Sequence, residues 1–263
     1  MSNEQKWRAP VSIFEHYFSK EYSKQRAFFH EKNGFTRTNL LSLHYDQREK
    51  IRDAWNEDLS PHASKYYSLS EQSVDIFWKE DSIFYDFFSN LNTDHIVELA
   101  CGHGKHVPQY IDKAKTICLV DVNKQNIDFC KKRFASSNKI SYYTNNGNDF
   151  STITSNSQTA IFSYDAMVHF ELLDIANYLH EANRILVTGG KILFHHSNVD
   201  FYPELSGMQK PQWRNFMSAD IFAYLAVRNG FTVLKQHIMS WGKGKNFYPN
   251  LDCLSLCQKE ITL

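Results

Sequence analysis

The sequence predicts an α/β protein whose sheet is mostly parallel and is preceded by a helical region. After residue 93, short apolar runs alternate with amphipathic stretches, which is typical of a parallel sheet covered by helices on both faces. The first run, Val97–Leu99, leads into a turn that contains Gly102 and Gly104. The last two runs follow each other without a helix between them, so we expect the final strand to run antiparallel to its neighbours.

The elements of this second region follow in a regular order. We expect strands at 96–100, 117–121, 139–144, 158–164, 191–196, 231–238 and 252–259. We expect helices at about 106–114 and at 124–135, 170–186 and 219–229. Pro108 falls in the first turn of its helix, where the missing N–H is not needed. Gly230 is expected to end the last helix.

Residues 1–92 are predicted to form a helical N-terminal extension, and residues 93–263 the domain that contains the sheet. Apolar residues recur at spacings of three and four from Val11 to about Asn90. Ser68 and Glu71 have the spacing of a capping box ahead of an amphipathic segment at 74–78, and a second short helix fits 82–91. Because the extension is rich in aromatic residues, it can be interpreted as a lid or acceptor cap, or as a packing extension or dimer contact.

Composition and charge limit the function classes. Of the 263 residues, 42% are apolar and 22% charged, which is typical of a globular protein. Lys plus Arg equals Asp plus Glu at 29 each, so no basic excess favours a nucleic acid partner. No apolar run is long enough for a membrane span, so we expect a cytoplasmic protein. The five cysteines form no Cys-x-x-Cys pair, and Cys253 and Cys257 are expected in the core.

Carboxylates occur in the first two strands of the predicted sheet. Glu98 lies in the first strand, and Asp121 ends the second, one βαβ unit later, where an acid can accept both hydroxyls of a ribose. A dinucleotide fingerprint would need a third glycine where Val107 stands, so a pyrophosphate site is disfavoured. The phosphate loop of ATP- and GTP-binding proteins is also absent.

The pattern Glu98, Ala100, Gly102, Gly104 and then Asp121 resembles the first motifs of class I S-adenosylmethionine-dependent methyltransferases, with Ala100 in place of a glycine. The resemblance implies a Rossmann-like sheet of seven strands, with residues 93–263 as the S-adenosylmethionine-binding catalytic domain. It places Glu98 near the amino group of the cofactor and Asp121 at its ribose. The cofactor-binding residues that it implies are Glu98, Ala100, Cys101, Gly102, Gly104, Asp121, Val122, Asn148, Asp149, Phe150, Ser163 and Tyr164. Residues 184–190 resemble the family's Arg-x-Leu-x-Pro-Gly-Gly turn.

Methyl transfer to a hydroxyl needs a proton acceptor close to the methyl group. Asp165, His169, His195 and His196 follow or end the fourth and fifth strands, where ligands bind in open parallel sheets. His169 is our first choice, and only one of His195 and His196 is expected to face the acceptor. Alternatively, Asp165, His169 and one strand histidine could hold a divalent metal, but such sites usually have more carboxylates, so metal-free base catalysis is favoured.

Several sequence segments indicate which class of molecule accepts the methyl group. Segments 163–170, 195–198, 214–218, 241–242 and 251–253 resemble bacterial methyltransferases of sugars and other small molecules, which implies O-methylation of a hydroxyl. Tyr202, Trp213 and Trp241 could stack on a carbohydrate. N-methylation of a small amine and a non-catalytic member that binds the cofactor or a partner stay open, as does a homodimer. A dehydrogenase is a more distant alternative.

Overall fold

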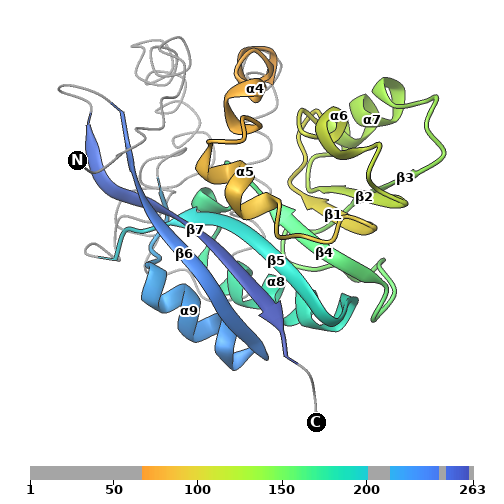
Figure 1. Ribbon diagram of the computed structural model, residues 1–263. Helices are drawn as coiled ribbons and strands as arrows, with labels where there is room; N and C mark the ends of the chain where they lie inside the picture. The colour runs from red at the N-terminus through yellow and green to blue at the C-terminus, as the bar shows by residue number, and fades with distance from the viewer. Residues whose placement is uncertain (1–66, 201–213, 243–246, 261–263) are drawn as a thin grey trace, which may run out of the picture.

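The computed structural model describes residues 67–200, 214–242 and 247–260. The predictions for helices before residue 67 and for stacking by Tyr202 and Trp213 lie outside these ranges. Two short helices, α4 (Val74–Phe77) and α5 (Ile83–Phe88), precede the sheet (Figure 1). Their buried aromatic side chains belong to the same core as the sheet, so this part of the N-terminal region packs directly on it.

Seven strands form one sheet in the order β3-β2-β1-β4-β5-β7-β6. The strands are β1 (His95–Leu99), β2 (Thr116–Asp121), β3 (Ile140–Thr144), β4 (Gln158–Ser163), β5 (Leu186–Ser197), β6 (Phe231–Trp241) and β7 (Tyr248–Lys259). The pairs from β3 across to β5 are parallel, whereas β7 runs antiparallel to both β5 and β6. The predicted fold class, including the antiparallel last strand, is confirmed.

Helices cover both faces of the sheet (Figure 1). The helices that follow β1 are α6 (Val107–Tyr110), α7 (Lys124–Arg133), α8 (Leu172–Ile185) and α9 (Ala219–Arg228). Because successive side chains of a strand point to opposite faces, Ile96 packs in the layer of α5 and α6 while Val97 packs in the layer of α8 and α9. Because β1 is parallel to both β2 and β4, the carboxyl ends of these three strands lie at one edge of the sheet, between the two cores.

Some predicted boundaries are wrong. The helix expected at 106–114 is regular only over α6, and residues 111–113 continue it as a turn. β5 begins at Leu186 rather than at 191, because the expected glycine turn lies inside the strand as an irregularity in its pairing with β4. Gly189 takes a φ of 77° there, which lets the strand continue past the irregularity.

The predicted capping box at Ser68 and Glu71 is also wrong. Residues 67–71 are already helical, and Ser73 is the residue that precedes α4. The Glu71 carboxylate instead pairs with Arg133 on α7, a partner that lies far away in the sequence. Ser82 does cap α5, since its hydroxyl accepts a hydrogen bond from the Tyr85 N–H at 3.0 Å.

The five cysteines are free and buried, in agreement with the prediction for Cys253 and Cys257. Among the helices of the described ranges, none combines the length and the apolar character that a membrane crossing requires.

Candidate cofactor and acceptor site

The turn after β1 has the backbone conformation that its small residues allow. Ala100, Gly102 and Gly104 have φ values of 55°, 54° and 69°, all in the left-handed region. A Cβ at Gly102 would lie 2.5 Å from Cε1 of Tyr67, and one at Gly104 would lie 2.7 Å from Cε2 of Phe134. Only glycine fits at these two positions, so the predicted glycine loop is a closely packed turn.

Asp121 holds this loop against the end of β2. Its Oδ2 accepts the Gly102 N–H at 2.9 Å, and its Oδ1 accepts the Asn123 N–H at 2.8 Å and Asn126 Nδ2 at 3.1 Å. Burial raises the pKa of Asp121, and these three bonds oppose the rise. A carboxylate offers about four acceptor positions, so Asp121 retains capacity for a further hydroxyl.

Glu98 lies beside the loop at the end of β1 with a different environment. It is buried, and its Oε2 accepts a hydrogen bond from the Tyr110 hydroxyl at 2.7 Å. Burial raises the pKa of Glu98 to about 8, against the lowering effects of that bond and of Lys105. An ammonium group brought next to Glu98 would favour its ionised form, which is the chemistry that a methionine amino group requires.

Tyr67 lies in the aromatic-rich N-terminal extension and packs on the glycine loop. Its hydroxyl accepts a hydrogen bond from Asn126 Nδ2 at 2.8 Å, the same amide that contacts Asp121. Its ring stacks on His103 with centroids 4.1 Å apart. Arg133 also donates to the His103 carbonyl at 2.9 Å. The last helical turn before α4 is therefore fastened to the glycine loop.

The segment predicted to reach an adenine, Asn148–Phe150, forms a tight loop after β3. The Asp149 carboxylate accepts hydrogen bonds from Asn146 Nδ2 at 2.8 Å and from the Ser151 N–H at 3.2 Å, so it organises the turn itself. Asn148 is half-buried, and the Phe150 ring is buried against Tyr178 at 5.3 Å between centroids. Of these three residues, Asn148 is the one whose side chain these turn contacts do not engage.

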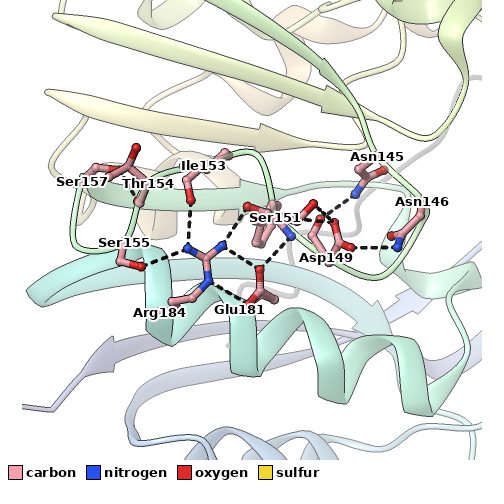
Figure 2. Close-up of polar contacts among 11 residues, drawn as sticks. Asn145, Asn146, Asp149, Ser151, Ile153, Thr154, Ser155, Ser157, Glu181 and Arg184 are labelled. Atoms are coloured by element: carbon pink, nitrogen blue, oxygen red, sulfur yellow. Dashed lines mark hydrogen bonds and ion pairs between the residues drawn. The ribbon is translucent and has the colours of Figure 1, made fainter.

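Two side chains of helix α8, Arg184 and Glu181, bind this loop (Figure 2). Arg184 donates to the carbonyls of Phe150 and Ile153, each at 2.9 Å, and pairs with Glu181. Glu181 in turn accepts the Phe150 N–H at 3.2 Å. Residues three apart on a helix share one face, which explains why these two side chains of α8 meet the loop together. Arg184 appeared in the sequence only as part of a turn motif, and its long-range partners could not be read there.

We expect the Arg184→Ala variant to lose about 1–3 kcal/mol of unfolding free energy, because two backbone carbonyls and Glu181 lose a charged donor. Arg228→Ala on the exposed side of α9 is the matched control and is expected to change little. Urea denaturation measures both. Amide exchange should rise in residues 145–157 of the first variant alone, and equal destabilisation of both variants would contradict this role of Arg184.

The predicted acceptor side follows β4. Tyr164 is buried and stacks on His195 with centroids 4.7 Å apart. Asp165 has a φ of 62°, and its Oδ2 lies 4.0 Å from Nζ of Lys105. Burial lowers the pKa of Lys105, which directly follows the glycine loop and was not singled out from the sequence. Ser163 Oγ is buried and has no hydrogen-bond partner among the described residues.

The three candidate histidines are in different surroundings. His169 ends a short 3-10 helix, Met167–His169, and is half-buried; its carbonyl accepts a hydrogen bond from Asn215 Nδ2 at 2.5 Å. His195 and His196 face opposite sides of β5, as strand geometry requires. His195 lies on the face of Tyr164 and Asp165, where Asp165 N–H donates to its Nδ1 at 3.1 Å.

His196 lies on the other face, stacked on Phe222 at 4.1 Å. Its ring nitrogens contact the Ser197 carbonyl and Ser255 Oγ, each at 2.8 Å. Burial lowers the pKa of His196 to about 3, so the ring is neutral and fully bonded. This geometry does not bring His196 to the other candidate residues.

The alternative of a metal bound by Asp165, His169 and a histidine of β5 requires these side chains to converge. Within the parts of the chain that the structure describes, no group of three or more His, Cys, Asp or Glu side chains is arranged to hold a metal ion.

Residues 96–190 match the model of a family described as "Methyltransferase domain". This span contains the glycine loop, Asp121, the loop of Asn148 and the turn after β4. Curated protein sequences gave no significant match.

Solved structures share the fold at low sequence identity. An S-adenosylmethionine-dependent methyltransferase from Mesorhizobium loti has a TM-score of 0.56 and 13% identity, over 67% of this chain and 97% of that one. A chain from the complex between the Haloferax volcanii Trm112 methyltransferase activator and a methyltransferase has a TM-score of 0.61 and 12% identity, over 79% and 98%. Geranyl diphosphate C-methyltransferase from Streptomyces coelicolor, solved with S-adenosyl-L-homocysteine, has a TM-score of 0.54 and 12% identity, over 66% and 74%.

These structures establish the Rossmann-like methyltransferase fold of the chain. Together with the matching family model, they support an S-adenosylmethionine-dependent methyltransferase.

Proposed function

We propose that the chain transfers a methyl group from S-adenosylmethionine to a hydroxyl of a small molecule, with a sugar as the favoured acceptor. The observation that carries the proposal is the hydrogen bond from the Gly102 N–H to Asp121 Oδ2, which joins the glycine loop of β1 to the carboxylate that ends β2. The family match over residues 96–190 supports the reaction class.

The residues of this edge fit the cofactor. The left-handed turn at Ala100, Gly102 and Gly104 brings the loop backbone next to Asp121 at the end of β2. Asp121 would accept a ribose hydroxyl, and Glu98 would pair with the amino group of the methionine part. Asn148, whose side chain is not engaged by the contacts of its turn, is the proposed contact to the adenine. When bound, S-adenosylmethionine supplies a methyl group on a sulfonium.

The turn after β4 is the proposed acceptor side. A hydroxyl must lose its proton as it attacks, and a positioned imidazole that titrates near neutral pH suits this step. His169 is the residue that we expect to accept this proton. Aromatic side chains of α4 and α5 pack next to Tyr164 and would keep water away from the acceptor. The ring centroids of Phe77 and Phe84 lie 5.1 and 4.6 Å from that of Tyr164.

His169→Ala is expected to lower kcat by about a hundredfold or more, because general-base catalysis typically contributes that much. Turnover is measured as S-adenosylhomocysteine release with a panel of hexoses and deoxyhexoses, and the dissociation constant for S-adenosylhomocysteine should not change. His180→Ala, on the exposed side of α8, is the matched control.

Two results would count against the proposal. If small amines are methylated and His169→Ala turns over at the wild-type rate, the chain is an N-methyltransferase. If the wild-type chain binds S-adenosylhomocysteine but methylates neither class, it is a binding member of the fold.

A further inference from the structure

Three buried ionisable side chains meet behind the proposed acceptor side. Arg214 donates to Asp252 through Nε at 2.7 Å and through Nη2 at 2.5 Å. His195 Nε2 lies 3.2 Å from Asp252 Oδ2. The Arg214 guanidinium also lies over the Trp241 ring, 4.6 Å from its centroid. His195, Arg214, Trp241 and Asp252 come from four of the segments that resemble methyltransferases of sugars and other small molecules, and they meet in one cluster.

The cluster fixes the proton of His195. The two bonds from Arg214 keep Asp252 ionised, and its pKa is well below the usual range despite complete burial. Since Nδ1 of His195 accepts the Asp165 N–H, the proton of a neutral ring is on Nε2. That is the nitrogen that faces the Asp252 carboxylate. The carboxylate attracts that proton electrostatically, although the contact does not have hydrogen-bond geometry.

The atom that His195 holds belongs to a strained residue. Asp165 has a φ of 62°, a conformation that side chains other than glycine adopt at a cost and that needs support from its surroundings. The same turn is held at its other end by Asn215, whose N–H donates to the Val168 carbonyl at 3.0 Å and whose Nδ2 donates to the His169 carbonyl at 2.5 Å. Arg214 and Asn215 are adjacent, so one short segment acts on both ends of the turn.

We propose that His195, with Asp252 and Arg214 behind it, is a positioning residue that holds Asp165 and the turn at 164–169 in the geometry needed by the methyl acceptor. This inference rests on the proposed function. It changes the role of His195, which the sequence suggested as a catalytic base: the side chain is 1% exposed, its Nδ1 accepts a hydrogen bond, and its Nε2 lies 3.2 Å from Asp252 Oδ2. A base must reach the substrate hydroxyl, and a ring placed in this way does not.

The proton assignment is tested first on the wild-type chain. Nitrogen-15 spectra of the histidine rings distinguish the two neutral tautomers, and we expect the Nε2–H form for His195, because its Nδ1 accepts the Asp165 N–H. Asp252→Asn, which can present an N–H to Nε2, is expected to move the proton to Nδ1. A wild-type ring that is doubly protonated, or protonated on Nδ1, would overturn the proposal because Asp165 N–H could not then donate to it.

Three substitutions then separate positioning from base catalysis. Asn places an oxygen near the position of Nδ1, so His195→Asn should keep the bond from the Asp165 N–H; His195→Gln and His195→Ala should not. We expect amide exchange at Asp165 to rise about tenfold in the Gln and Ala variants, and less than about threefold in the Asn variant, as expected for loss of one hydrogen bond. His180→Asn serves as the control.

Turnover of any hexose or amine acceptor should follow the same order, with His195→Asn rescuing most of kcat. Equal exchange at Asp165 in all three variants would overturn the proposal, as would equal loss of turnover in His195→Asn and His195→Ala when exchange differs. Failure of the proposed function is recognised separately, because the wild-type chain would then either not bind S-adenosylhomocysteine in a calorimetric titration or bind it and turn over no acceptor.

Discussion

Asp121→Asn is expected to bind S-adenosylhomocysteine about a hundredfold more weakly than wild type, since hydrogen bonds to a charged group contribute about 1.5–3 kcal/mol each. Both carboxylate oxygens accept backbone N–H groups, one from Gly102 and one from Asn123. A carboxamide can accept only on its oxygen, so whichever way Asn is oriented its NH2 faces an N–H donor. The substitution therefore loosens the glycine loop as well as the ribose contact. Calorimetric titration measures the effect.

The control for this variant is Asp128→Asn, the same change on the exposed surface of the neighbouring helix α7. Its carboxylate pairs with Lys124 on the surface, and such pairs contribute little. Affinity within about twofold of wild type is expected for the control. Wild-type affinity in Asp121→Asn would show that the ligand does not use this edge of the sheet.

Glu98→Gln is expected to stabilise the ligand-free chain at alkaline pH and to weaken ligand binding. Burial raises the pKa of Glu98 from 4.5 to about 8. A carboxyl group whose pKa is raised on folding costs nothing below pH 4.5, and its cost grows as the pH rises towards 8, because the unfolded chain is ionised there. At about 1.4 kcal/mol per pKa unit, the cost reaches about 5 kcal/mol at pH 8 and above.

A glutamine has no charge to bury and can still accept the Tyr110 hydroxyl hydrogen bond. The stability difference between Glu98→Gln and wild type, measured by urea denaturation, should therefore increase from pH 5 to pH 8 and then level off. The same variant loses the partner of an ammonium group, so its affinity for S-adenosylhomocysteine should fall about tenfold or more. A stability difference that does not depend on pH would contradict the assigned environment of Glu98.

The sheet and the glycine loop could be predicted because their signals are local. Alternating apolar runs define the strands, and Gly102 and Gly104 stand where only glycine fits. Ala100 stands where the family pattern has a glycine, and it takes the left-handed conformation with a φ of 55°. Glu98 and Asp121 could also be placed near each other, because each lies at or near the end of an apolar run and the two runs form adjacent parallel strands.

Other parts of the site depend on long-range contacts. Tyr67 reaches Asn126 across 59 positions of the chain, and Arg214 reaches Asp252 across 38. A sequence shows neither which distant side chain will face a turn nor which histidine of a neighbouring pair will face the site. Asp149 shows a further limit, because its short side chain satisfies its own turn, and a motif comparison does not detect that competition.

The central claim is that the edge formed by the glycine loop and Asp121 binds S-adenosylmethionine. Calorimetric titration of the wild-type chain with S-adenosylhomocysteine tests it most directly. We predict binding of one ligand per chain with a micromolar dissociation constant. The absence of binding at millimolar ligand, or binding of NADH in its place, would contradict the account.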